Sequence, residues 1–167
     1  GAFVWATVSN TPTGTYKGDD GYTYAYYLFE SDGTLTVTTA GLLEVLLVSG
    51  GGPGWNFNGT KPEGQGGRII TGLHPFDAAA HAITIGAGGS YDSTYSQPTA
   101  LGSLTTGTAS YGGGAASPNG AYLSTITGQS LYVGGRLSQT PASAYGGGAV
   151  VGGNGQAGVA IAKTRLN

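Results

Sequence analysis

The chain has 167 residues, a length that suits one domain with a hydrophobic core. Six basic and eight acidic residues give a net charge of −2, which excludes a basic surface for nucleic acid or for anionic lipid. There are no cysteines, so disulfides and thiolate metal sites are excluded, and no apolar run reaches the roughly 18 residues of a membrane span.

Glycine is the unusual component, with 34 residues where an average protein has about 7%. These glycines lack the strict every-third-residue period of collagen. Disordered chains usually carry many more charges than the 8% found in this sequence, and aromatic and β-branched segments separate the glycine runs. We therefore expect a folded protein.

The first third of the chain predicts an N-terminal attachment segment at residues 1–21, with a short strand at 3–5, followed by the domain at residues 22–167. Residues 22–29 alternate, which predicts a strand with one tyrosine-rich face that packs against neighbouring strands. Ser31, Asp32 and Gly33 predict a type I′ hairpin turn that leads into a return strand at 34–39.

The central strand is expected at residues 42–48, which are apolar except for Glu44 and run directly into a glycine cluster. Further strands are predicted at 68–71, 81–85 and 159–163, the last with Val159 and Ile161 on one face and alanines on the other. The only helix-like stretch, 77–80, is too short to stand alone. The fold class is therefore all-β, with little or no helix.

The glycine runs predict a second structural feature. Residues 110–115 and 144–149 repeat a Tyr-Gly-Gly-Gly-Ala motif. Glycine lets neighbouring backbones approach closely, so extended three-residue-per-turn segments can bond side by side through their peptide groups. Flexible loops are the alternative. We favour an ordered, polyglycine II-like layer built from Gly50, Gly51, Gly52, Gly112, Gly113, Gly114, Gly146, Gly147 and Gly148.

No motif indicates catalysis, a cofactor or a metal. Residues 153–158 match G-x-G-x-x-G, but a dinucleotide site needs a following helix, and the nine remaining residues predict a strand. His74 and His81, with Asp77 between them, lack the further ligand that a metal site needs. The eight carboxylates lie at or before Asp92, and no motif pairs them for acid–base chemistry. We therefore expect a protein that is not an enzyme.

Four aromatic residues lie among turn residues and outside the alternating strands. Exposed rings stack on the faces of sugars, while Thr, Asn and Gln side chains bond to hydroxyl groups, which suits a chain with few charges. Packing between subunits is the structural alternative. The candidate ligand contacts are Trp55, Phe57, Tyr91 and Tyr95.

Four segments, taken in order, carry a family resemblance: Phe29-Glu-Ser-Asp-Gly-Thr-Leu-Thr-Val37, Leu43-Glu-Val-Leu-Leu-Val-Ser-Gly-Gly-Gly52, Ile83-Thr-Ile-Gly-Ala-Gly-Gly89, and Tyr145-Gly-Gly-Gly148 with Gly155-Gln-Ala-Gly-Val-Ala-Ile161. Together they resemble the glycine-rich domain of minor tail proteins and tail fibres of tailed bacteriophages. Ser49 and Pro53 depart from the longer glycine run of that family, and residues 90–144 match it in composition.

The resemblance implies a jelly-roll-like β-sandwich with a glycine-rich layer, displayed on the virion surface and often trimeric. The first expected role is a receptor-binding module at the tail tip that recognises host cell-surface carbohydrate. The alternative is a structural capsid decoration or head-fibre protein without a specific ligand. In both roles, segment 1–21 is expected to contact other virion proteins, with no nucleic-acid binding and no membrane insertion.

Overall fold

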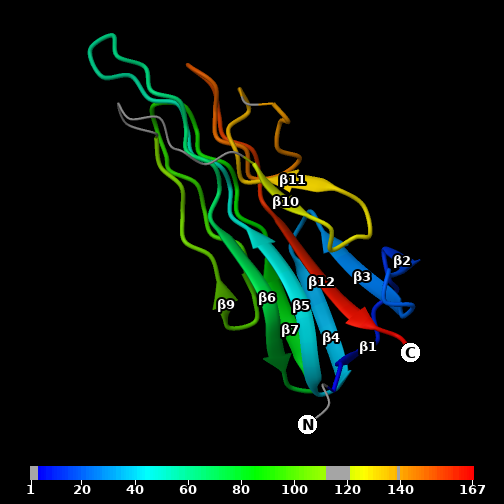
Figure 1. Cartoon of the computed structure of the whole chain (residues 1–167). Helices are drawn as coiled ribbons and strands as arrows, with labels where there is room; N and C mark the ends of the chain where they lie inside the picture. The colour runs from blue at the N-terminus through cyan, green and yellow to red at the C-terminus, as the bar shows by residue number, and fades with distance from the viewer. Residues whose placement is uncertain (1–3, 112–120, 139) are drawn as a thin grey trace.

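The computed structural model describes residues 4–111, 121–138 and 140–167 as an elongated β protein (Figure 1). These residues form strands β1 to β12 and no helix, which confirms the predicted all-β fold class. Within the same residues, no helix is long and apolar enough to cross a membrane.

Sheet I is a five-stranded antiparallel sheet that places the central and C-terminal strands side by side. β12 lies between β3 and β5, so the last strand of the chain closes the middle of the sheet. In spatial order the strands are β2 (Gly14–Lys17), β3 (Thr23–Phe29), β12 (Val159–Arg165), β5 (Gly41–Val48) and β6 (Ile69–Phe76).

Sheet II packs against one face of sheet I. Its strands, in order, are β1 (Thr7–Val8), β4 (Gly33–Thr39), β7 (Ala80–Thr84), β8 (Ala100–Leu101) and β9 (Leu104–Thr105). The separate β10–β11 hairpin (Tyr122–Ser124 and Leu131–Val133) lies over the other face of sheet I. Both β1 and β2 come from residues 1–21, so the predicted attachment segment contributes one strand to each sheet.

The predicted hairpin at Ser31, Asp32 and Gly33 is wrong. β3 and β4 belong to different sheets, so the chain crosses between the sheets at this point. The Asp32 carboxylate accepts a hydrogen bond from the backbone N–H of Ile85 at 2.8 Å, which ties the crossing to the end of β7. Gly33 has no positive φ, although a type I′ turn requires one at this position.

The hydrophobic core explains why residues 42–48 are almost continuously apolar. Leu43, Val45 and Leu47 face sheet II, whereas Leu46 and Val48 face the β10–β11 hairpin. β5 is therefore covered on both sides. The chain is a β-sandwich-like pair of sheets with a third layer, and its jelly-roll connectivity stays a prediction.

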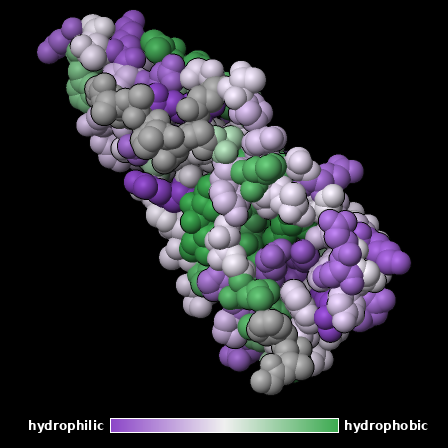
Figure 2. All heavy atoms as spheres, viewed as in Figure 1, coloured by the Kyte–Doolittle hydropathy of each residue, from purple (hydrophilic) through white to green (hydrophobic). Residues whose placement is uncertain are grey.

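The alternation of the C-terminal strand is confirmed. Ala160 and Ala162 of β12 point into the core between the sheets, while Val159 and Ile161 point to the hairpin side. The small alanine side chains leave room for the larger residues of sheet II. On the hairpin side, Figure 2 shows apolar surface gathered at the middle of the molecule, with hydrophilic residues towards both ends.

Beyond the sheets, extended segments form a glycine layer, made of residues 49–54, 64–67, 86–89, 146–149 and 153–158. Peptide groups join segments that are far apart in the sequence. Gly51 donates its N–H to the Gln156 carbonyl at 2.8 Å, and its own carbonyl accepts from the Gly89 N–H at 2.9 Å. A Cβ atom added at Gly51 would lie 1.9 Å from the Gly147 carbonyl oxygen, so side chains are sterically excluded at this position.

The structure places two of the three predicted glycine runs within this layer. Gly51 lies against the backbone of Gly146 and Gly147, whereas Gly50 lies against Ala87 and Gly52 against Ser110. The third run, Gly112, Gly113 and Gly114, lies outside the described residues.

Candidate functional site

An aromatic cluster lies where the glycine layer ends in loops. Trp55, Phe57, Tyr95 and Tyr111 form this cluster. The Trp55 ring centroid is 5.6 Å from that of Tyr95 and 5.6 Å from that of Tyr111, and the Phe57 and Tyr111 centroids are 4.9 Å apart. Figure 1 shows the loop around residues 55–62 at the far end of the molecule from both termini.

A tight turn presents Phe57 at this end. Phe57 and Thr60 exchange backbone hydrogen bonds of 2.7 and 2.8 Å. Asn58 and Gly59 between them have φ values of 48° and 92°, the left-handed pair of a type I′ turn. The Asn56 side chain accepts a hydrogen bond from the Gly59 N–H at 3.1 Å, so the turn is fixed from inside.

Hydrogen bonds also fix this loop to its neighbours. The Asp92 N–H donates to the Gly54 carbonyl at 3.0 Å, and the Asp92 carboxylate accepts from the Asn56 N–H at 3.2 Å. The Asn154 side chain accepts from the Tyr91 N–H at 2.8 Å. Hydrogen bonds therefore join three loops that are far apart in the sequence, and these bonds fix the backbone next to the aromatic cluster.

The structure brings together three of the four predicted ligand contacts. Phe57 and Tyr95 are 44% and 48% exposed, and Trp55 lies half-buried behind them. Among the described residues, Tyr91 makes no ring contact with the cluster; its backbone serves instead to join the loops. Sequence reasoning missed Tyr111 as a cluster member, although Tyr111 belongs to the first Tyr-Gly-Gly-Gly-Ala repeat.

The cluster offers apolar rings beside neutral amide groups. Asn56 and Asn58 lie in the same loop, and Asn154 in the adjoining one. Rings with amides are suited to ligands that have both C–H faces and hydroxyl groups. In the described part of the chain, no group of three or more His, Cys, Asp or Glu side chains could hold a metal ion.

The two histidines discussed above bond locally. The His74 Nε2 atom lies 3.0 Å from the Thr71 carbonyl oxygen, and the His81 Nε2 atom lies 2.9 Å from the Asp77 carbonyl oxygen. His81 also packs edge-on against Phe76, with the ring centroids 5.2 Å apart. Both histidine side chains therefore make local contacts that stabilise the fold.

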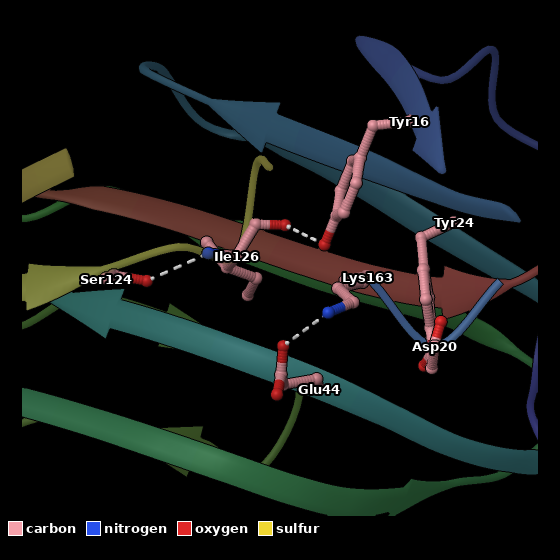
Figure 3. Close-up of polar contacts among 7 residues, drawn as sticks. All are labelled: Tyr16, Asp20, Tyr24, Glu44, Ser124, Ile126 and Lys163. Atoms are coloured by element: carbon pink, nitrogen blue, oxygen red, sulfur yellow. Dashed lines mark hydrogen bonds and ion pairs between the residues drawn. The ribbon is translucent and has the colours of Figure 1, made fainter. Parts of the chain in front are cut away.

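A second group of interacting side chains lies on sheet I, on the hairpin side (Figure 3). Lys163 of β12 places its Nζ atom 3.2 Å from a carboxylate oxygen of Glu44 on β5. The same nitrogen lies 4.3 Å from the ring centroid of Tyr24 and 5.5 Å from that of Tyr16. The Tyr16 hydroxyl donates to the Ile126 carbonyl at 3.1 Å, which ties β2 to the connection between β10 and β11. We call Tyr16, Asp20, Tyr24, Glu44 and Lys163 the Lys163 cluster.

Hydrogen bonds shift the acid–base behaviour of this cluster. The Tyr24 hydroxyl donates to the Asp20 carboxylate, which lowers the pKa of Asp20 and raises the pKa of Tyr24. Burial acts to lower the pKa of Lys163, but the Tyr16 hydroxyl and the Glu44 carboxylate outweigh it, and the pKa is raised. Lys163 is therefore a charged anchor at neutral pH, which does not suit a nucleophile.

We expect the Asp20→Asn variant to lose part of the acid dependence of folding stability. The pKa of Asp20 in the folded protein lies below its ordinary value of 3.8, so the unfolded chain binds more protons between the two values. The stabilising contribution is complete above the ordinary value and is lost as pH falls through the lowered one. Urea unfolding of both proteins at a series of pH values from neutral to acidic measures the difference.

The control for this prediction is Asp77→Asn, which changes an exposed carboxylate in the turn between β6 and β7. This variant should keep the acid dependence that Asp20→Asn loses. Parallel pH profiles for wild type and Asp20→Asn would contradict the role given to the Tyr24–Asp20 hydrogen bond.

No protein-family model matches the chain, and no curated protein or solved structure matches it either.

Proposed function

We propose that the chain is a virion-surface adhesion module, of the kind found at phage tail tips, that binds host cell-surface carbohydrate through the aromatic cluster. The observation that carries this proposal is the exposure of Phe57 and Tyr95 on hydrogen-bonded loops, at the end of the molecule away from both termini. A ligand on a cell surface can approach this end while the opposite end stays with the particle.

The geometry supports carbohydrate because the loops are fixed before a ligand arrives. Ordering a loop on binding costs free energy. The hydrogen bonds of Asn56, Asp92 and Asn154 hold these loops in one conformation before binding, so less free energy is lost when a ligand binds. Rings exposed beside amide side chains offer both contacts that a sugar needs, apolar for its C–H face and polar for its hydroxyls.

The alternative role is a structural capsid decoration or head-fibre protein without a specific ligand. One observation favours it: Phe57 and Tyr95 are exposed apolar rings at one end of the molecule. Contact between copies in a trimer would cover these rings. Segment 1–21 would contact other virion proteins in either role. The two roles differ in whether the aromatic cluster faces solvent or another subunit in the assembled particle.

We expect Trp55→Ala and Tyr95→Ala to weaken binding to host cells and their isolated surface glycans by about 30-fold each, because a central aromatic contact contributes about 2 kcal/mol. Tyr122→Ala is the matched control, since Tyr122 is an exposed tyrosine of β10 that lies outside the cluster. Saturation binding of labelled protein, with circular dichroism to check folding, makes the comparison.

Equal loss of binding in the Tyr122→Ala control would contradict the assignment of the site to the cluster. Absence of saturable binding by the wild type, together with tight association with empty capsids, would favour the decoration role.

A further inference from the structure

A cavity of about 480 Å³ lies beside the Lys163 cluster, at the end of sheet I away from the aromatic cluster. β2, β3 and β12 supply one wall, and residues Thr125 and Gly128 of the β10–β11 connection supply the other. The Gly128 backbone has a φ of 83° and lies against the Tyr16 ring, where a Cβ atom would come within 2.6 Å of it. This close contact between Gly128 and Tyr16 holds the β10–β11 connection in place beside the cavity.

The charges that line the cavity are unusual for this chain. Only six basic and eight acidic residues occur in 167 positions, yet two of each kind line this one cavity. They are Lys17, Lys163, Asp19 and Asp20. Local charge is therefore concentrated and balanced at this cavity.

These charged groups differ in how firmly they are held. Lys163 is fixed by Glu44 at 3.2 Å, and the Asp20 carboxylate accepts from the Tyr22 N–H at 3.0 Å as well as from the Tyr24 hydroxyl. Lys17 and Asp19 are exposed at the rim. Lys163 and the exposed Asp20 are thus held by partners within the chain, and Lys17 and Asp19 can turn towards a ligand.

We propose that this cavity is a second binding site, which takes a neutral, polyhydroxylated ligand of about one or two sugar units. A hydroxyl group donates and accepts at once, so it can bond to an ammonium and to a carboxylate in the same site. Because the two carboxylates and the two ammonium groups balance, a ligand that carries a net charge gains no net attraction from this lining. The volume lies within the roughly 300–1,000 Å³ typical of small-molecule sites. This inference does not rest on the function proposed for the aromatic cluster.

The test is a titration of the ¹⁵N-labelled full chain with glucose, N-acetylglucosamine and lactose, followed by NMR. Glycine serves as the zwitterionic probe and inorganic phosphate as the anionic one. We expect saturable shifts of the amides of Lys17, Asp19, Thr125 and Gly128 with at least one sugar. A Lys17→Ala, Asp19→Ala double variant should bind about tenfold more weakly or worse.

Two control variants separate this site from the aromatic cluster. Lys61→Ala removes an exposed lysine in the loop that carries Phe57, and it should leave the titration unchanged. Trp55→Ala should also leave it unchanged, even where that variant abolishes binding to host glycans.

Three outcomes would overturn the proposal. One is the absence of saturable shifts at these amides with every sugar, up to about 100 mM, where even millimolar affinity would saturate the site. Another is saturation by glycine or phosphate but by no sugar. The third is loss of the sugar-induced shifts in Trp55→Ala, which would place the ligand at the aromatic cluster instead.

Discussion

Gly51→Ala is expected to lower the free energy of unfolding by about 3 kcal/mol or more, because the added methyl group would overlap backbone on a neighbouring segment. The Cβ atom would lie 1.9 Å from the Gly147 carbonyl oxygen and 2.3 Å from its carbonyl carbon. Those atoms cannot rotate away as a side chain would. The Gly147 segment is itself held in place by hydrogen bonds. The Gln156 N–H donates to the Gly147 carbonyl, and the Ala149 N–H donates to the carbonyl of Gly52, the residue after Gly51.

Gly107→Ala is the matched control for this change. Gly107 has no positive φ, and the nearest atom to an added Cβ there is the flexible Arg68 side chain at 3.4 Å. We expect that variant to unfold within about 0.5 kcal/mol of wild type in guanidinium chloride. Equal denaturation midpoints for the two variants would mean that the layer can expand around a side chain, contrary to our account.

The Thr99→Val variant is expected to lose about 2 to 4 kcal/mol of stability, although it preserves the shape of the side chain. Thr99 is fully buried at the junction of the sheets and the glycine layer. Its hydroxyl donates to the Val48 carbonyl at 2.7 Å and accepts from the Gly86 N–H at 2.9 Å. Valine would leave the buried Gly86 N–H without the acceptor that Thr99 supplies, and it would remove a hydrogen bond from the Val48 carbonyl.

Two further variants test this explanation by thermal and chemical unfolding. Thr99→Ser keeps the hydroxyl and should recover most of the lost stability. Thr84→Val makes the same chemical change at an exposed position of β7 and should stay close to wild type. If Thr99→Ser is as unstable as Thr99→Val, the buried hydrogen bonds are not the cause.

Much of the fold could be predicted because its long strands have clear periodicity. Alternation or a continuous apolar run predicts β3, β5 and β12, and the structure divides their residues between two cores, which the sequence analysis did not predict. β8 to β11 have two or three residues each, too few to show a period. The Asp32-Gly33 turn was misread because local turn chemistry cannot show that the two flanking strands enter different sheets.

The candidate sites differ in the same way. Trp55, Phe57 and Tyr95 stood out because aromatic residues are unusual among turn residues, and the structure places them together. The Lys163 cluster gave no such signal. Lys163 and Glu44 are partners only because β12 pairs with β5 in a register that aligns them, although they are far apart in the sequence. A single sequence does not contain that register.

The glycine layer divides the chain into two kinds of position that tolerate change very differently. A Cβ atom added at Gly51 or Gly64 would lie 1.9 Å from a neighbouring carbonyl oxygen, so no other residue can replace glycine there without moving backbone. The loop that carries Phe57 is far less crowded, since nothing lies within 4 Å of a Cβ atom added at Gly59 and only the positive φ of 92° favours glycine there. The exposed loops can therefore change in sequence or in length while the glycine layer beneath them keeps its shape. The same glycine layer can thus support many different loops.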